Sequence, residues 1–230
     1  MSPILNTILT AVGGVLAGLA CAGAVLYWQQ QRLNLARWHA AAGEKIADHW
    51  QHLAHHDDTT GLPNRRAFLA QLDRALAAGG ATGVVLLDLD DFKTVNDTFG
   101  HECGNDLLTA VGLRLADLPA PVRFVARLSG DEFALLIDGD AALTHLSARA
   151  AWHTISAHPL PITAQHKIPL RASVGYATAT EDQTAGGLLH EADLAMYHAK
   201  RSGSGVYQPS VAEHTTMPPH TRCRDLRRKD

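Results

Sequence analysis

The sequence predicts an α+β domain built on one ferredoxin-like, palm-type sheet, preceded by a transmembrane helix and a helical linker. Two observations predict the sheet: an apolar run at 83–92 that ends in acids, and two β-type runs at 122–128 and 133–138 joined by a polar turn. Helical segments lie before, between and after these runs. This mixed order favours a sheet with helices on one face over a doubly wound sheet.

The composition is that of a protein with a folded core. The 230 residues are 46% hydrophobic and 19% charged, which excludes a wholly disordered chain. The net charge of -3 gives no basic field, so we expect no nucleic-acid partner. Cys21, Cys103 and Cys223 are an odd number and have no metal-type spacing, which argues against a disulfide framework and a structural zinc site and favours a reducing compartment.

Residues 1–31 predict a transmembrane segment. The stretch 3–28 has no Asp, Glu, Lys, Arg or His, and it is long enough to cross a hydrocarbon core of about 30 Å. Arg32 and Arg37 follow it, which predicts a single-pass protein of the inner membrane with its C-terminal portion in the cytoplasm. A cleaved signal peptide is the alternative, but a basic n-region is missing and the apolar run is too long.

Residues 32–52 predict a helical linker. In the stretch from 29 to about 56, small and apolar residues recur at alternating three- and four-residue steps: Leu33, Ala36, Ala40, Gly43, Ala47, Trp50 and Ala54. This spacing is typical of a heptad seam, so we expect a marginal parallel homodimer that continues the membrane span. A lone amphipathic linker is the alternative.

The domain itself is expected to span 53–208. A polar turn with Gly61 and Pro63 leads into a helix that ends at Gly79-Gly80. The run 83–92 then predicts a buried strand, because it is short and continuously apolar. Residues 105–118 predict an amphipathic helix, whose leucines and valine fall on one side.

The second half of the domain begins with the hairpin, whose turn is the polar, Gly-containing segment 129–132. Helices are expected at 141–157 and 185–202, a strand at 168–179, and a short last strand at 205–208. The basic tail 209–230 contains the pair Pro218-Pro219 and is expected to be disordered.

Acidic residues gather where the predicted strands end. Asp88 and Asp90 are two apart and therefore point to one face, while Asp91 points away. Asp131 and Glu132 lie in the hairpin turn. Carboxylates at turns are commonly just solvent-exposed residues that cap the backbone. Here, however, a lysine and amides follow within a few residues. Together they predict a site for Mg²⁺ and nucleotide phosphates.

Five collinear segments resemble the GGDEF family of diguanylate cyclases. They are DDTTGLPNRRAF, LLDLDDFKTVNDTFGHECGNDLL, RLSGDEF, ASVGYA and EADLAMYHAKRSGSG. The matches run in family order from about Leu53 to Tyr207, which is roughly two-thirds of the chain. The resemblance implies an enzyme that condenses two GTP into cyclic di-GMP and two pyrophosphates. Because each family domain holds one GTP, it also implies a homodimer with facing active sites.

The resemblance implies a role for each matched residue. Asp88, the Leu89 carbonyl and Asp131 would bind Mg²⁺, with Mn²⁺ as the other possible ion. Asp131 would also accept the 3′-hydroxyl proton, with support from Glu132, and Lys93 would stabilise the transition state. The residues implied in substrate binding are Asn96, His101 and Asn105 for guanine and ribose, Gly130 for backbone approach to the phosphates, and Lys200 for the triphosphate.

Several positions depart from the family pattern. Ser129 replaces the first glycine of the signature and fits without strain only if its φ is negative. Asn105 replaces an aspartate and loses charge-assisted pairing with guanine, and Ser204 replaces a common arginine. Ala120 and Arg123 replace the R-x-x-D pair, so product inhibition through that motif is expected to be missing.

These departures leave two alternatives to a diguanylate cyclase. The first is a catalytically degenerate GGDEF domain that binds GTP as a regulatory scaffold. The second is a cyclase that makes another cyclic nucleotide, since Asn96 and Asn105 alone do not settle which base is bound.

Overall fold

The computed structural model describes residues 54–157, 159–161 and 167–207, with residues 13, 14, 16, 18, 19, 23, 26–35, 37–39, 50 and 52 of the N-terminal part. The chain divides into two compact units, Met1–His52 and Leu53–Asp230. The predicted basic tail at 209–230 lies outside the described residues, as does much of the predicted span and heptad seam.

The described residues of the first unit are helical, and their side chains are exposed. The large apolar ones are more than half exposed: Leu16, Leu19, Leu26, Tyr27, Trp28, Leu33, Leu35, Trp38 and Trp50. Within the part of this unit that the structure describes, no helix combines the length and the apolar character that crossing a bilayer needs.

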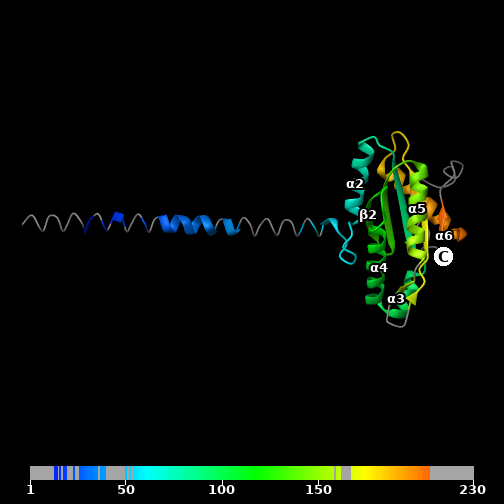
Figure 1. The fold of residues 1–230 in the computed structure, drawn as a ribbon, viewed down its shortest axis with the longest axis horizontal. Helices are drawn as coiled ribbons and strands as arrows, with labels where there is room; N and C mark the ends of the chain where they lie inside the picture. Colours follow the sequence, from blue (N-terminus) through cyan, green and yellow to red (C-terminus); the bar gives the residue numbers. More distant parts are fainter. Residues whose placement is uncertain are drawn as a thin grey trace, which may run out of the picture. The chain divides into compact units, whose positions relative to one another are not determined.

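The second unit holds helices and strands in mixed order, which Figure 1 follows by colour along the chain. Its elements are α2 (Arg65–Ala77), β1 (Thr82–Leu89), α3 (Phe92–Phe99), α4 (His101–Ala116), β2 (Val122–Ser129), β3 (Glu132–Asp138), α5 (Ala141–Ser156), β4 (Leu160–Pro161), β5 (Lys167–Ile168), β6 (Ala172–Thr178), α6 (Ala185–Ser202) and β7 (Val206–Tyr207).

The main sheet has the strand order β2-β3-β1-β6-β7. Its neighbouring strands are antiparallel except β6 and β7, which are parallel, while β4 and β5 form a separate two-stranded ribbon. The central strand β1 therefore pairs on both sides, with β3 and with β6. This arrangement confirms the predicted α+β class and the β2–β3 hairpin.

Helices cover both faces of the sheet, so the expectation of helices on one face was wrong. Val84 and Leu86 of β1 belong to an apolar cluster with α2 and α6, whereas Val85 and Leu87 belong to a second cluster with α4 and α5. All eight residues of β1 are buried. Because successive side chains of a strand point to opposite faces, a strand that is buried throughout needs cover on both.

Local signals explain where the helices begin. The Asn64 side chain accepts a hydrogen bond from the backbone of Ala67 at the start of α2, and Asp140 and Thr184 cap α5 and α6 in the same way. Helix α4 begins at His101 rather than at the predicted residue 105, because Gly100, with φ at 87°, separates it from α3. The apolar pattern did not predict α3, of which only Val95 is buried.

Candidate active site

The β2–β3 hairpin brings the two predicted acid clusters together. Ser129 and Glu132 are paired across the hairpin, and Gly130, with φ at 50°, begins the turn between them. Glu132 is also the cross-strand partner of Asp88 on β1. The backbone N–H of Leu89 donates to the Asp131 carbonyl at 3.2 Å. The structure thus places Asp88, Leu89 and the turn at one end of the sheet.

A lysine from the C-terminal helix joins these acids. The Lys200 Nζ of α6 donates to Asp88 Oδ1. The Asp88 side chain is fully buried, whereas one third of the Lys200 side chain is exposed. A buried carboxylate needs such a partner, because an uncompensated buried charge is strongly destabilising. Lys200 and Asp88 are 112 positions apart.

The pKa of Asp131 is raised above its ordinary value. Burial of the carboxyl is the main cause, followed by the negative charge of Asp88; Glu132 adds to the effect, and the positive charge of Lys200 opposes it. Asp131 is therefore close enough to Asp88 for their charges to repel. Two carboxylates held together in this way attract a cation.

The oxygen atoms at this place suit a hard divalent ion. Mg²⁺ commonly takes one or two protein carboxylates and completes its shell with waters and phosphate oxygens. Asp88 and Asp131 supply that number. Among the residues that the structure describes, no group of three or more His, Cys, Asp or Glu side chains could hold a metal ion.

The two acids that follow Asp88 lie as the strand pattern predicts. Asp90 Oδ1 accepts a hydrogen bond from Ser173 Oγ at 2.8 Å, and Ser173 is the cross-strand partner of Asp88. Asp91 instead forms an exposed ion pair with Arg171 at 3.2 Å. Asp91 has a positive φ and precedes α3 directly. It therefore marks the bend at which the chain leaves β1 for α3.

The remaining predicted site residues lie on α3 and α4. Lys93, His101 and Asn105 are exposed, and Asn96 is half-buried. A Cβ on Gly104 would lie 1.9 Å from Asn96 Oδ1, so the carboxamide of Asn96 lies directly against the first turns of α4. A larger residue at 104 would therefore force the Asn96 carboxamide to turn away.

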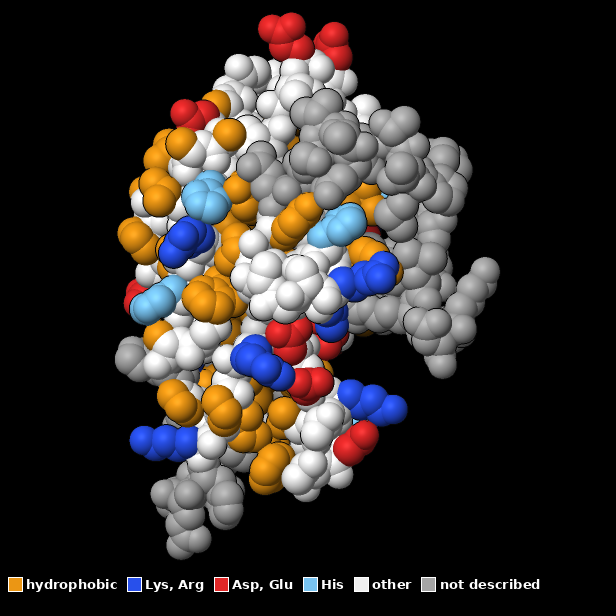
Figure 2. Space-filling view, turned by 90° about the vertical axis from the view of Figure 1, so that its right-hand side faces the viewer, with side chains coloured by type: hydrophobic (Ala, Val, Ile, Leu, Met, Phe, Trp, Pro, Cys, Tyr) orange, Lys and Arg blue, Asp and Glu red, His pale blue; other side chains and the backbone are white. Residues whose placement is uncertain are grey.

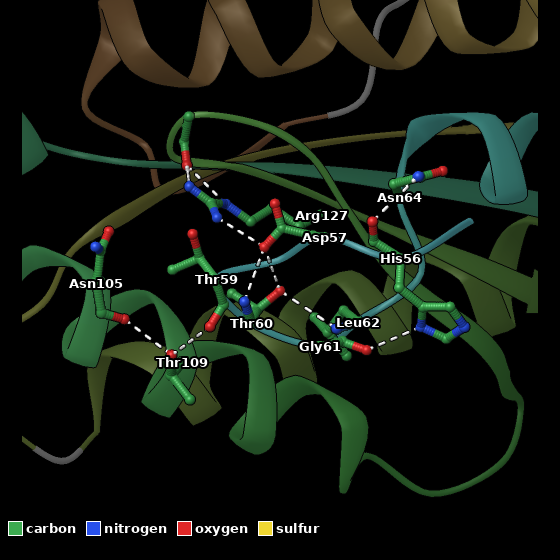
Figure 3. A network of polar contacts seen from close by, with 11 residues as sticks. His56, Asp57, Thr59, Thr60, Gly61, Leu62, Asn64, Asn105, Thr109 and Arg127 are labelled. Carbon is green, nitrogen blue, oxygen red and sulfur yellow. Dashed lines mark hydrogen bonds and ion pairs between the residues drawn. The ribbon is translucent and has the colours of Figure 1, made fainter. Parts of the chain in front are cut away.

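Arg127 is a residue of the site to which the sequence reasoning assigned no role. Its Nε and Nη2 donate to the Gly130 carbonyl at 2.9 and 2.7 Å, and its Nη1 donates to Asp57 Oδ1 at 2.7 Å (Figure 3). Asp57 also accepts hydrogen bonds from the N–H and hydroxyl of Thr60. Arg127 therefore joins the 57–64 turn to the hairpin turn.

The charge on Asp57 is well compensated. Burial alone would raise the pKa of its carboxyl, but the hydrogen bonds from Arg127 and Thr60 outweigh burial and lower that pKa below its ordinary value. The same turn is tied to α4, because Thr109 Oγ1 donates to the Thr59 carbonyl at 3.0 Å. Figure 3 shows both links side by side. The only sequence signal for this network was the place of Asp57 and Arg127 in two matched segments.

Ser129 occupies its position without backbone strain, since its φ is not positive. Its hydroxyl donates to Glu132 Oε2 at 2.9 Å. Serine therefore replaces the family glycine at 129 without strain.

On one face of the second unit, acidic side chains gather near the middle and lysine and arginine side chains border them (Figure 2).

Comparison with known proteins identifies the family to which this chain is similar. The model of the GGDEF domain of diguanylate cyclases matches residues 54–205. The chain is 36% identical over 179 residues to the diguanylate cyclase TpbB of Pseudomonas aeruginosa, which covers 75% of this chain and 41% of that protein. It is 37% identical over 165 residues to the response regulator PleD of Caulobacter vibrioides, with 68% of this chain and 36% of PleD covered.

Solved structures show the same fold. The coiled coil and GGDEF domain of DgcB from Caulobacter crescentus, in complex with c-di-GMP, superimposes with a TM-score of 0.71 at 27% identity, over 77% of this chain and 97% of that one. The GGDEF domain of TpbB gives 0.59 at 33% identity, over 66% and 99%. The chain spans 24–41% of the length of the curated relatives TpbB, PleD and a signalling protein of Caulobacter vibrioides. The chain belongs to the GGDEF family of diguanylate cyclases.

Proposed function

We propose that this chain is a diguanylate cyclase that condenses two GTP into cyclic di-GMP and releases two pyrophosphates. The observation that carries the proposal is that the hairpin turn with Asp131 lies beside Asp88 and Leu89 of β1, a separate segment, and that Lys200 binds Asp88 there. Family membership supports it. Because the chain matches only part of each relative, the activity is argued from these residues.

The carboxylates of the site would bind a metal ion and accept a proton. Asp88, the Leu89 carbonyl and Asp131 would hold Mg²⁺ or Mn²⁺, which when bound would neutralise charge on the phosphoryl group under attack. Asp131 would accept the proton of the attacking 3′-hydroxyl, and Glu132 would support it. A carboxyl whose pKa is raised by burial is better suited to accept a proton near neutral pH.

The cationic and amide side chains would orient GTP. Lys200 and Lys93 would contact the triphosphate, and Asn96, His101 and Asn105 would contact guanine and ribose. The attacking 3′-oxygen forms an ester bond to the α-phosphorus of the second GTP, and the bond to pyrophosphate breaks. With one GTP per domain, the two bonds of the product require two facing domains.

We further propose a homodimer anchored at the inner membrane by 1–31, with the catalytic domain in the cytoplasm. The charge-free stretch 3–28 supports the anchor. The exposed apolar side chains of the first unit support contacts with lipid or with a second chain. Solubilisation in detergent and crosslinking test the membrane anchor and the dimer.

The test of the activity is turnover of GTP by the full chain in detergent, with Mg²⁺ and identification of the product by mass spectrometry. We expect cyclic di-GMP from the unmodified protein and none from Asp131→Ala. Asp117→Ala is the matched control, because Asp117 is an exposed acid at the C-terminal end of α4. A different cyclic nucleotide would contradict the substrate proposed here.

The same assay separates the cyclase from a degenerate domain. Asn105 is exposed on α4 and offers an amide where a carboxylate would bind guanine more strongly. A degenerate scaffold would bind GTP with measurable affinity and form no product even when dimerised artificially. That result would overturn the cyclase proposal and leave GTP binding as the function of the site.

A further inference from the structure

Ser129 and Glu132 face each other where the β2–β3 hairpin closes. They are paired across the two strands, and the Ser129 hydroxyl donates to Glu132 Oε2 at 2.9 Å. Both residues are half-buried. A hydrogen bond to an ionised carboxylate is stronger than one between neutral groups. The serine hydroxyl is thus a specific contact to one of the acids at the site.

The rest of the turn is already held by other atoms. Arg127 binds the Gly130 carbonyl with two N–H groups, and Leu89 donates to the Asp131 carbonyl. These contacts fix the backbone and leave the Glu132 side chain with its own rotations about single bonds. Ser129 bonds one oxygen of this carboxylate, which fixes the direction of the other oxygen as well.

We propose that Ser129 is a positioning residue that fixes the Glu132 carboxylate in place beside the site of the divalent ion and the nucleotide. This inference rests on the proposed cyclase function, since it assigns Glu132 a part in that site. Glycine, the family residue at this position, has no side-chain donor. The serine of this chain therefore adds a contact to the hairpin that a glycine leaves out.

The first measurement is binding of Mn²⁺ alone to the full chain, followed by electron paramagnetic resonance. Groups that orient the side chains of a metal site commonly change metal affinity about 10-fold or more when they are removed. We expect Ser129→Ala to weaken Mn²⁺ binding about 10-fold. Ser129→Thr keeps the hydroxyl and should restore most of the affinity. Ser147→Ala is the control, because it removes a hydroxyl bonded to the Leu143 carbonyl within α5.

A double-mutant cycle tests whether Ser129 acts through Glu132. We expect Ser129→Ala to cause no further loss of Mn²⁺ affinity when Glu132 is replaced by alanine. Circular dichroism and thermal unfolding verify that each variant is folded. Equal Mn²⁺ affinity of Ser129→Ala and the unmodified protein would overturn the inference. Additive losses in the cycle, or no Mn²⁺ binding by the unmodified protein, would do so as well.

The failure of this inference is distinguishable from failure of the proposed function, because Mn²⁺ binding is measured without GTP. A chain that binds Mn²⁺ through Ser129 and Glu132 but forms no cyclic di-GMP would disprove the cyclase and retain the positioning role. A chain that forms cyclic di-GMP with unchanged Mn²⁺ binding in Ser129→Ala would disprove the positioning role alone.

Discussion

Arg127 Nη1 lies 2.7 Å from Asp57 Oδ1, although the two residues are 70 positions apart. The same guanidinium holds the Gly130 carbonyl, so one side chain ties the 57–64 turn to the turn that carries Asp131. Arg127 is nearly buried. Its contacts therefore contribute both to the stability of the domain and to the geometry of the site.

Replacing Asp57 by asparagine should lower the free energy of unfolding by about 2 kcal/mol, because it leaves a nearly buried guanidinium without its anionic partner. Chemical denaturation near neutral pH measures the loss. Asp58→Asn is the control, since Asp58 is the exposed neighbouring acid. Equal losses for both variants would show that the ion pair contributes nothing specific.

The contribution of Asp57 should depend on pH. Its pKa is lowered in the folded protein, so its contribution is complete above the ordinary value of 3.8 and disappears as pH falls through the folded value. Asp57→Asn and the unmodified protein should therefore converge in stability in acid. A difference that stays constant down to acid unfolding would contradict the assignment.

Replacing Asp131 by asparagine should abolish turnover and yet stabilise the fold by about 1 kcal/mol, the size commonly gained when a strained functional site is relieved. Burial and the charge of Asp88 raise the pKa of Asp131, so its ionisation costs stability as pH rises above 3.8. Thermal unfolding at neutral and acid pH measures the gain, which should vanish in acid. A lower unfolding temperature at neutral pH would refute the repulsion.

Replacing Lys200 by methionine should weaken GTP binding and lower stability by about 2 kcal/mol, because the fully buried Asp88 loses a cationic partner. Urea unfolding and GTP titration measure the two effects. Arg201→Met is the matched control, since Arg201 is exposed on the same helix and contacts Tyr197. The prediction is wrong if the two variants behave alike.

Replacing Gly175 by alanine should destabilise the domain by about 3 kcal/mol, the upper part of the usual range for overpacking. A Cβ there would lie 2.0 Å from the Met196 backbone nitrogen and 2.3 Å from the Ala192 carbonyl oxygen, so α6 must move away from β6 and carry Lys200 with it. Gly186→Ala is the control on α6, because a Cβ there meets nothing within 4 Å. The free energy of unfolding of that variant should rise by about 0.5–1 kcal/mol, which thermal unfolding measures.

Replacing Asn105 by aspartate should raise kcat/KM for GTP about 5- to 10-fold, since a carboxylate makes stronger, charge-assisted bonds to guanine donors than an amide does. Asn105 is exposed on α4, so the change should leave stability nearly the same. Steady-state turnover with GTP and with ITP, which lacks the exocyclic amine, measures the effect. Equal gains for both nucleotides would exclude pairing with that amine.

Much of the fold could be predicted because its signals are local. The helix predicted at 185–202 has the same bounds in the structure, where Thr184 caps its first turn. The hairpin follows from two β-type runs around a glycine-containing turn. Helix α3 could not be predicted in this way, since it buries only Val95 and its first residue follows Asp91 in a left-handed conformation.

The sequence by itself determined the α+β class, the β2–β3 hairpin and the family, and it predicted which acids, lysines and amides form the site. Only the tertiary structure decided that helices cover both faces of the sheet, that Lys200 contacts Asp88, and that Arg127 joins Asp57 to the Gly130 carbonyl. The physical reason is the distance along the chain over which each kind of interaction acts. Caps, turns and apolar periodicity act within a few residues, whereas these contacts join residues up to 112 positions apart and exist only after the sheet has formed.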